Sequence, residues 1–469
     1  MMRKKLDVMN PQTNELIESL ALATGEELEQ MVEAAYKAQP AWEAKPLYER
    51  ASILYKFMDA VEQKQNEIGE ILAREMAKPI GQAAGECVYA PEIGRGYIER
   101  AKHLYGEVLS QSSPGFEDDL IFTKREALGV VAGIIPFNYP VEMVIQKSVP
   151  SMIMGNTVIL KAPSSNPLAV KKMVETAHEA GVPDDVLQFT VCDRKTCTEY
   201  LLTNDKIAAI SLTGSTEAGI EMVKAGADTM KRVFLELGGN DPLIIRSDAD
   251  LDTAVQSTID GRWENNGQIC CADKRFLVHK DIKDLYVEKL KAALDHQKRG
   301  SAMDPDAELT CLVTEEAAIK VEKQIGRTVE QGGKVVYGGR RKGAFIEPTI
   351  IDGVPKDADV AFDMEIFGPV YPIFPFETDE EAIELANQTR YGLMAGIVTS
   401  DIVKAFELAA KLKASGVCVN GSSCYRQNEQ AFGGCKASGI GNEGVSASLE
   451  EYSRIKTYAL KGAFPANKA

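Results

Sequence analysis

Hydrophobic residues recur at helical spacing through the first quarter of the chain. Leu28, Met31, Val32 and Ala35 share one face of a helix because intervals of three and four residues bring side chains to the same side. This periodicity dominates residues 25–125. We therefore predict a layer of helices over that region.

The pattern then changes to short β-branched runs closed by loop residues. Residues 129–135, 157–160 and 207–212 are predicted strands, and the polar, alanine-rich stretch 168–180 is a predicted helix. Strands that alternate with helices imply βαβ units and a parallel sheet. Ligands of such sheets gather at the carboxyl ends of the strands.

A second alternation, from residue 241 to about residue 414, predicts a second α/β domain. Its apolar runs are residues 243–245, 275–278, 334–337 and 395–398. No repeat of about 20–50 residues is evident. No low-complexity linker separates the halves, so the boundary between them must be compact. Gly238-Gly239 is the best hinge candidate, because paired glycines tolerate unusual backbone angles.

Composition and charge narrow the function classes. The 469 residues are 45% hydrophobic and 26% charged, which suits two or three globular domains. A net charge of −16 disfavours binding to nucleic acid and to anionic membranes. The most apolar stretch, 129–145, is interrupted by Pro136, Pro140 and Glu142, so we predict no transmembrane segment. No secretion signal precedes Asn10-Pro11, and we expect a cytoplasmic protein.

Cysteine and histidine usage limits the chemistry. Nine cysteines, an odd number without a C-x-x-C pair, favour a reducing compartment over a disulfide framework. The four histidines never occur four residues apart, so we predict no metal site. We therefore expect any catalytic base to be a carboxylate.

Two segments contain candidate reactive groups. Cys270 and Cys271 follow a polar, glycine-containing loop whose backbone amides could stabilise a thiolate; equally, either can be a small buried hydrophobic residue. Glu236 ends an apolar run, which suits a general base that faces a cleft, although a strand-end carboxylate in water fits as well.

Two loops contain candidate binding groups. Asn138 lies between two prolines, where its amide could donate to an oxyanion or simply form a turn. Residues 214–219 follow a predicted strand and open a helix, as a phosphate cradle does, but they match neither G-x-G-x-x-G nor a Walker loop.

Together these segments resemble the aldehyde dehydrogenase superfamily over essentially the whole chain. That family has seven motifs, and all occur here in order. They are Pro-Phe-Asn-Tyr-Pro at 136–140, a strand-ending lysine (Lys161), Gly-Ser-Thr-x-x-Gly at 214–219, Glu-Leu-Gly-Gly at 236–239, Gly-Gln-x-Cys at 267–270, Glu-x-Phe-Gly-Pro at 365–369 and Phe-Gly-Gly-x-Lys-x-Ser-Gly at 432–439.

The resemblance implies roles for the reactive residues. Cys270 is the implied nucleophile, and Glu236, 34 residues earlier, is the implied base. Asn138 would stabilise the oxyanion, helped by the backbone N–H of Cys270. Glu443 matches a secondary proton-relay acid, although Asn442 stands where the family usually has arginine.

The resemblance also implies an NAD(P) site. Lys161 would bind the adenosine ribose and Glu365 the nicotinamide ribose, with Phe367 beside it. Four further residues would shape the site: Gly214, Ser215, Gly219 and Leu237. Ser164 stands where many NAD-preferring relatives have a glutamate that repels a 2′-phosphate, so we expect NADP to be tolerated.

Clues to the substrate conflict. Segments 233–276 and 432–443 most resemble bacterial succinate-semialdehyde dehydrogenases, whereas Tyr425-Arg426 is similar to lactaldehyde dehydrogenases. The arginines that hold the succinate semialdehyde carboxylate in relatives align with Gln146 and Glu264, so that anchor is missing here.

Arg426 could replace the missing anchor, because guanidinium pairs with carboxylate, sulfonate or phosphate; it could equally be a solvated loop residue. Ile269 replaces the arginine of non-phosphorylating glyceraldehyde-3-phosphate enzymes, and Cys271 neighbours the nucleophile. We expect Ile269 and Cys271 to lie at the substrate pocket. We expect the substrate to be a short polar or anionic aldehyde.

Other functional classes fit less well. A CoA-acylating dehydrogenase typically lacks the glutamate found at Glu236, and a cysteine hydrolase needs a histidine partner that no motif supplies. A retired family member acting as a binding protein would be expected to have lost the nucleophile, the base or the cofactor contacts, and none of these is lost here.

The implied fold is α/β, with three parts. These are a Rossmann-like cofactor domain (1–111 and 128–238), a catalytic α/β domain (239–437), and an oligomerisation arm with the C-terminal tail (112–127 and 438–469). Such arms build homodimers or homotetramers.

Overall fold

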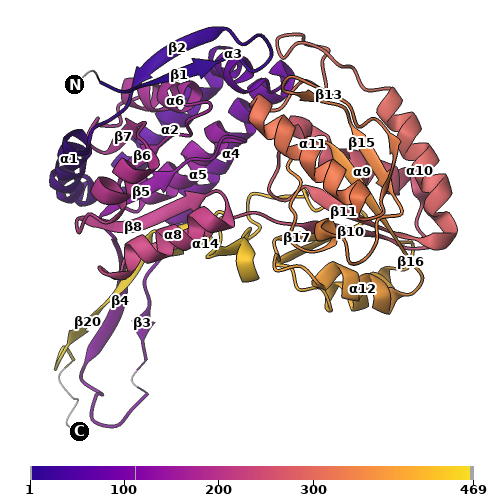
Figure 1. Ribbon diagram of the computed structural model, residues 1–469. Helices are drawn as coiled ribbons and strands as arrows, with labels where there is room; N and C mark the ends of the chain where they lie inside the picture. Colours follow the sequence, from indigo (N-terminus) through magenta and orange to yellow (C-terminus); the bar gives the residue numbers. More distant parts are fainter. Residues whose placement is uncertain (1–2, 111, 465–469) are drawn as a thin grey trace.

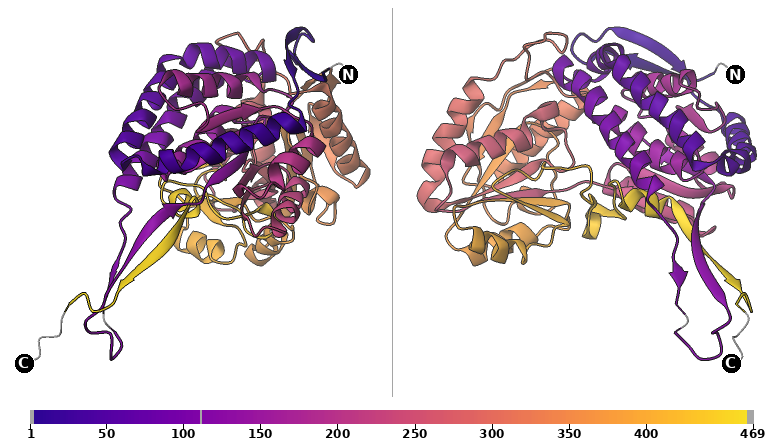
Figure 2. Two further views of the ribbon diagram at one scale, coloured as in Figure 1. Left: turned by 90° about the vertical axis from the view of Figure 1, so that its left-hand side faces the viewer. Right: turned by 180° about the vertical axis from the view of Figure 1, so that it is seen from behind.

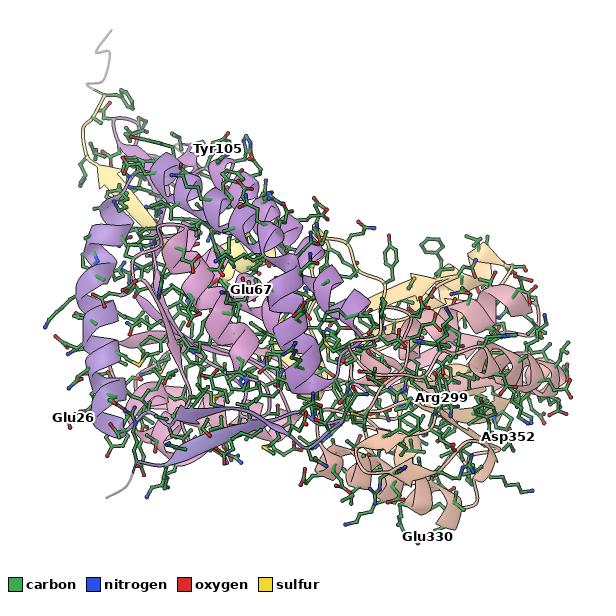
Figure 3. The ribbon with its side chains drawn as sticks, turned by 90° about the horizontal axis from the view of Figure 1, so that it is seen from above. Glu26, Glu67, Tyr105, Arg299, Glu330 and Asp352 are labelled. Atoms are coloured by element: carbon green, nitrogen blue, oxygen red, sulfur yellow. The ribbon has the colours of Figure 1, made fainter. Side chains whose placement is uncertain are left out.

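The computed structural model describes residues 3–110 and 112–464, which form two lobes and a projecting arm (Figure 1). Seen from above, Glu26, Glu67 and Tyr105 mark the first lobe and its side of the molecule, and Arg299, Glu330 and Asp352 mark the second lobe (Figure 3).

The first lobe is built on a six-stranded sheet. Its strands are β5 (Val130–Ile134), β6 (Thr157–Lys161), β7 (Leu187–Thr190), β8 (Ile207–Thr213), β9 (Arg232–Glu236) and β19 (Gly439–Ile440). The order is β19-β9-β8-β5-β6-β7, parallel except for β19, which pairs antiparallel with β9. The predicted parallel sheet is therefore present.

Helices pack around this sheet. They are α1 (Gly25–Ala44), α2 (Leu47–Gln63), α3 (Gln65–Met76), α4 (Ile80–Lys102), α5 (Pro140–Ile153), α6 (Leu168–Glu179), α7 (Arg194–Thr196), η1 (Cys197–Leu202), α8 (Thr216–Ala227) and α14 (Ala447–Glu451). A hairpin of β1 (Lys5–Met9) and β2 (Leu16–Ala21) lies at the N-terminal side. Phe57, Tyr97 and Ile145 are fully buried in a core shared by α2, α4 and α5.

The predicted helical layer is correct only as far as Lys102. Two strands follow it, β3 (Val108–Leu109) and β4 (Leu120–Ala127), so the prediction was wrong for residues 103–125. Gly106 crosses so close to β4 that a Cβ on it would lie 1.8 Å from the Thr123 carbonyl oxygen. Pairing with distant segments, rather than local periodicity, decides the structure here.

The second lobe contains a seven-stranded sheet. Its strands, in spatial order, are β12 (Lys334–Tyr337), β15 (Thr349–Asp352), β16 (Val370–Phe376), β11 (Asp273–His279), β10 (Asp241–Ile245), β17 (Met394–Val398) and β18 (Gly416–Val419). Only β12 runs antiparallel to its neighbour.

The remaining elements cover this sheet or connect to it. They are α9 (Leu251–Arg262), η2 (Glu264–Gly267), α10 (Lys280–Asp295), α11 (Glu315–Glu330), β13 (Arg341–Lys342), β14 (Phe345–Ile346), η3 (Asp359–Ala361), α12 (Asp379–Asn387), α13 (Ile402–Ala409) and η4 (Lys436–Ser438). Within the described residues, none of the helices is long and apolar enough to cross a membrane.

The arm is a three-stranded antiparallel sheet. Strand β20 (Ser453–Leu460) pairs along its length with β4, and β3 pairs with the other edge of β4. Figure 2 shows this sheet extending away from both lobes. The arm thus joins the end of the chain to a segment more than three hundred residues earlier.

The two sheets meet at Gly238-Gly239, which connects β9 in the first sheet to β10 in the second. The expected reason for these glycines was wrong, because neither adopts a positive φ. Instead, a Cβ on Gly238 would lie 2.4 Å from Glu365 Oε2. The Glu365 carboxylate can approach the backbone this closely only because residue 238 is a glycine and has no side chain. The division of the chain into three domains stays a prediction.

Candidate functional site

Two cavities lie side by side between the lobes. Cavity A, of about 300 Å³, is lined by residues that include Glu142, Glu236 and Arg426. Cavity B, of about 330 Å³, is lined by residues that include Gly238 and Phe367. Three residues line both cavities: Asn138, Thr213 and Cys270. Cys270 therefore stands where a molecule in one cavity can meet a molecule in the other.

The two sheets present opposite ends to this site. Asn138, Gly214 and Glu236 lie at the carboxyl ends of first-sheet strands, as expected, but Cys270 and Glu365 precede second-sheet strands β11 and β16. The expectation that ligands gather at carboxyl ends thus fits only the first sheet. At the carboxyl end of β10, ion pairs occupy the space instead.

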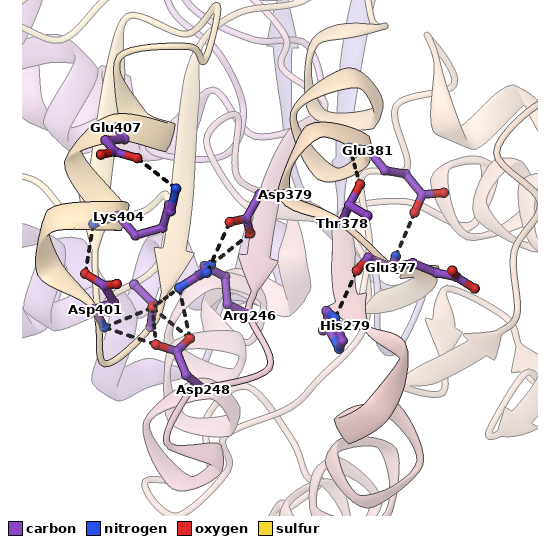
Figure 4. A network of polar contacts seen from close by, with 11 residues as sticks. Arg246, Asp248, His279, Glu377, Thr378, Asp379, Glu381, Asp401, Lys404 and Glu407 are labelled. Carbon is purple, nitrogen blue, oxygen red and sulfur yellow. Dashed lines mark hydrogen bonds and ion pairs between the residues drawn. The ribbon is translucent and has the colours of Figure 1, made fainter.

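Figure 4 shows those ion pairs. Arg246, directly after β10, donates to both carboxylate oxygens of Asp379 at 2.9 and 3.1 Å and to Asp248 at 3.2 Å. Because its guanidinium is engaged by these acids, this end of the second sheet is closed by internal contacts.

A left-handed turn places Cys270 between the cavities. Asn265, Asn266 and Gly267 have φ values of 51°, 54° and 73°, a region that favours asparagine and glycine. The buried Asn266 amide fixes the turn: its Oδ1 accepts from the Thr310 backbone N–H at 2.8 Å. Asn265 Nδ2 donates to the carbonyl of Asn138 at 3.1 Å. The Asn265 bond holds the Cys270 loop against the Asn138 loop.

Glu236, the last residue of β9, points into cavity A. It is 6% exposed, and its Oε2 has no hydrogen-bond partner within the described residues. Burial, with the nearby Glu443 carboxylate and Cys270, raises the pKa of Glu236 well above its ordinary value. The group is therefore a buried carboxyl with an unpartnered oxygen, and its surroundings favour the uncharged form.

Cys270 is a thiol in this state. The adjacent Cys271 thiol and burial raise the pKa of Cys270, while the Lys274 ammonium lowers it. All nine cysteines lie in the described part of the chain and are free. Thiolate formation at Cys270 consequently needs a base or a positive charge brought by a ligand.

Asn138 has an uncommitted side chain. Its backbone carbonyl accepts from the Lys78 ammonium at 3.1 Å, which fixes the loop. Its side-chain amide makes no hydrogen bond to any described residue, and the residue lines both cavities. The amide is thus available to donate to a ligand atom bound beside Cys270.

Charged groups form a linked cluster at the far wall of cavity A. Arg426 Nη1 lies 3.3 Å from Glu142 Oε1, and its Nη2 lies 3.4 Å from Glu443 Oε2. The Lys147 ammonium lies 3.6 Å from Glu443 Oε1, and the Arg426 guanidinium stacks over the Phe432 ring at 4.2 Å. Arg426 is therefore a fixed wall residue rather than a solvated loop residue.

Most residues expected at the substrate line cavity A. They are Glu264, Ile269, Cys271 and Arg426. Gln146 does not; it is buried behind the wall, where it donates to Glu142 Oε1 at 3.1 Å and accepts from the Tyr97 hydroxyl. The fully buried helix α5 turns Gln146 toward α4 rather than toward the cavity.

The residues expected at the dinucleotide fall into two groups. Gly214, Ser215, Leu237, Glu365 and Phe367 line cavity B. Gly219 lies behind it, where a Cβ would be 2.7 Å from Leu237 Cδ1. Lys161 ends β6 and the exposed Ser164 follows this strand; neither residue is in the lining of the cavity.

These features fit a dinucleotide. Ser215 caps α8, accepting from the Ala218 N–H at 3.2 Å, so the helix N-terminus opens at the edge of cavity B and favours an anionic phosphate. The bare backbone of Gly238 leaves room for the Glu365 carboxylate. Within the described ranges, no group of acidic, histidine and cysteine side chains could hold a metal ion.

Sequence reasoning missed two buried lysines. Lys274 donates to the carbonyl of Cys270 and lies 3.3 Å from Glu365 Oε1, so it ties the cysteine to the wall of cavity B. Lys147 joins Glu443 to Ser211 from behind cavity A. A lysine inside an otherwise buried element, as in β11 and α5, is the signal that would have found them.

Comparison with known proteins agrees with this arrangement. Residues 1–458 match the sequence model of the aldehyde dehydrogenase family. Glutarate-semialdehyde dehydrogenase of Pseudomonas aeruginosa is 36% identical over 461 residues, covering 97% of this chain and 94% of the relative. Lactaldehyde dehydrogenase of Methanococcus vannielii is 32% identical, covering 98% of each chain.

Solved structures give the same result. The crystal structure of succinate-semialdehyde dehydrogenase from Burkholderia pseudomallei superposes with a TM-score of 0.95 at 34% identity, covering 98% of this chain and 95% of that one. The chain belongs to the aldehyde dehydrogenase family. It is an NAD(P)-dependent oxidoreductase, and the predicted family, α/β fold, enzyme class and cofactor are confirmed.

Proposed function

We propose that this enzyme oxidises a short, polar aldehyde to its carboxylic acid through a thioester on Cys270. The observation that carries the proposal is the position of Cys270, which lines both cavities. An aldehyde in cavity A and a dinucleotide in cavity B would then meet at the sulfur. The relatives are named for glutarate semialdehyde, which is anionic, and for lactaldehyde, which is neutral; both are short polar aldehydes and support this class.

In the proposed reaction, the Cys270 thiolate adds to the aldehyde carbon and forms a thiohemiacetal. The Asn138 amide and the Cys270 backbone N–H donate to its oxyanion. NAD(P), when bound, supplies the hydride acceptor. The thiol proton leaves to water, and Glu236, once ionised, activates the water that hydrolyses the thioester, with Glu443 as the second acid of a proton path.

Cavity B is the proposed dinucleotide site. Glu365 and Phe367 would hold the nicotinamide ribose and Lys161 the adenosine ribose. The loop of Gly214 and Ser215 would hold phosphate, and Gly219 and Leu237 would shape its wall. Ser164 carries no charge to repel a 2′-phosphate, so we expect kcat/KM for NADP within a hundredfold of that for NAD; a larger deficit contradicts this assignment.

Hydrolysis is favoured over transfer to CoA because Glu236 lines cavity A with an unpartnered oxygen. Free cysteines fit a reducing compartment, and we propose the cytoplasm as the site of action. Several apolar side chains on the arm are exposed, and we propose that a second copy of this chain covers them in a homodimer or homotetramer.

Trapping the intermediate tests the function directly. Glu236→Gln should form the thioester but hydrolyse it slowly, so intact-mass analysis with aldehyde and NAD(P) should show an acyl adduct, mapped to Cys270 by peptide analysis. Cys270→Ala should show none. Absence of an adduct on Glu236→Gln across a broad aldehyde panel would contradict the proposal.

A further inference from the structure

The charge of cavity A bears on the far end of the substrate. Among the described residues that line it are four glutamates, Glu142, Glu236, Glu264 and Glu443, but Arg426 is its only basic residue. Which charges remain uncompensated depends on how these groups are paired.

Two of the carboxylates are balanced by two cations. Both terminal nitrogens of Arg426 are engaged, one by Glu142 and one by Glu443, and the buried Lys147 ammonium also faces Glu443. Glu142 in addition accepts from the Tyr89 hydroxyl at 3.2 Å and from Gln146 at 3.1 Å. A substrate carboxylate would therefore meet a guanidinium already held between two carboxylates, and would add a third negative charge to a partly buried wall.

The other two carboxylates differ from each other. Glu236 is buried, and burial with the nearby Glu443 carboxylate raises its pKa, which favours its uncharged form in the unliganded cavity. Glu264 is exposed at the cavity lining, and within the described residues its carboxylate makes neither a hydrogen bond nor an ion pair. Glu264 is therefore the uncompensated negative charge of cavity A.

We propose that cavity A selects an aldehyde whose far end carries a positive charge, that Glu264 is its partner, and that carboxylate-bearing aldehydes are disfavoured. This inference rests on the proposed function and names the substrate class of the same site. Glu264 is a specificity residue, because its proposed role is in substrate binding.

Three aldehydes test the charge preference. One is 4-trimethylammoniobutanal, whose quaternary nitrogen prevents cyclisation; the second is 5,5-dimethylhexanal, its neutral isostere; the third is 4-oxobutanoate, which is anionic. We expect kcat/KM for the cation to exceed that for the isostere by about tenfold, mainly through KM, and 4-oxobutanoate to be the poorest substrate. A higher kcat/KM for 4-oxobutanoate than for the cation overturns the proposal.

Substitutions identify the partner. Glu264→Gln should reduce the cation-to-isostere ratio to about one, and Glu264→Arg should favour 4-oxobutanoate over the cation. Glu380→Gln is the matched control, because Glu380 is an exposed carboxylate on α12, outside cavity A, without a partner among the described residues. An unchanged ratio in Glu264→Gln refutes the role of this residue.

A measurement on the unaltered enzyme guards against misfolded variants. Raising the salt concentration should lower the cation-to-isostere ratio, because ions screen a charge at an exposed position; a ratio that does not respond to salt counts against an ionic preference. The proposed function fails separately, when Glu236→Gln forms a Cys270 adduct with none of the aldehydes in a broad panel that includes these three. An adduct with the neutral isostere, together with equal kcat/KM for cation and isostere, overturns the charge preference alone.

Discussion

The Lys274 ammonium lies 3.3 Å from Glu365 Oε1 and donates a hydrogen bond to the carbonyl of Cys270. Lys274 is buried at the start of β11, so this ion pair is largely shielded from water. One side chain thereby fixes the distance between the cysteine loop and the proposed nicotinamide-ribose carboxylate. We infer that Lys274 is a positioning residue for both cavities.

Replacing Lys274 should uncouple these two groups. Lys274→Met keeps the length of the side chain but leaves Glu365 without its cation and the Cys270 carbonyl without its donor. We expect kcat to fall about a hundredfold, the scale of misplaced reacting groups, and KM for NAD(P) to rise. Steady-state kinetics measures both, and Lys323→Met, an exposed residue on α11, serves as the control. Unchanged KM and kcat would contradict a positioning role.

The side chain of Asn138 should matter mainly for the transition state. Asn138→Ala removes an amide that makes no internal hydrogen bond within the described chain, so stability should change little. Loss of one oxyanion donor typically costs about 10²–10³ in turnover. We expect a decrease of that size in kcat with little change in KM for NAD(P). Turnover close to that of the unaltered enzyme refutes the oxyanion role.

The turn before Cys270 should contribute measurably to stability. Asn266→Gly retains freedom for the left-handed backbone but loses the side-chain bonds to Thr310, whereas Asn266→Ala also introduces strain at φ 54°. Urea denaturation should therefore rank the unaltered enzyme above Asn266→Gly and Asn266→Ala lowest. The step between the two variants should be about 1 kcal/mol. The reverse order would show that the turn relaxes when the side chain is removed.

Asp241 predicts a pH dependence of stability. Burial, opposed by the Lys274 ammonium, raises the pKa of Asp241 to about 8, and its Oδ2 has no partner within the described residues. In the unfolded chain the pKa is about 4. The folded state therefore retains a proton that the unfolded state loses, so this stabilisation is complete below about pH 4 and disappears as the pH rises toward about 8.

Asp241→Asn has no such proton to lose. As the pH rises from about 4 to about 8, the unaltered enzyme should lose stability relative to Asp241→Asn. The difference in unfolding free energy should grow by up to about 1 kcal/mol per pH unit. Urea titrations at several pH values measure the difference, with the exposed Asp228→Asn as control. Parallel pH profiles for the two proteins would show that Asp241 titrates alike in the folded and unfolded states.

The arm should mediate self-association. Val108 and Ile455 on its sheet are 74% and 62% exposed. Apolar side chains that are exposed together on one surface mark sites of contact with another protein. Ile455→Lys should reduce the mass measured by light scattering toward that of one chain, because a buried lysine at an interface is costly. Val336→Lys on β12 provides a control at an exposed strand position. A monomeric unaltered enzyme would contradict the assembly proposal.

Local patterns predicted much of the fold. The runs at 157–160, 207–212 and 395–398 became β6, β8 and β17 almost residue for residue, because alternation and β-branching act within a few neighbours. The failure at residues 103–125 has the opposite cause: β4 exists because it pairs with β20, far along the chain. Helical periodicity carries no information about such a partner.

The sequence by itself determined the family, the order of the motifs and the candidate reactive pair Cys270 and Glu236, because each motif is contiguous and its residue types are required by the chemistry. Only the tertiary structure decided how charges are paired around them. Arg426 meets Glu142 across 284 residues of chain, and Glu264 is left without a partner within the described residues. Electrostatic energy depends on distances in space, and those distances are set by the packing of the two lobes rather than by spacing along the chain.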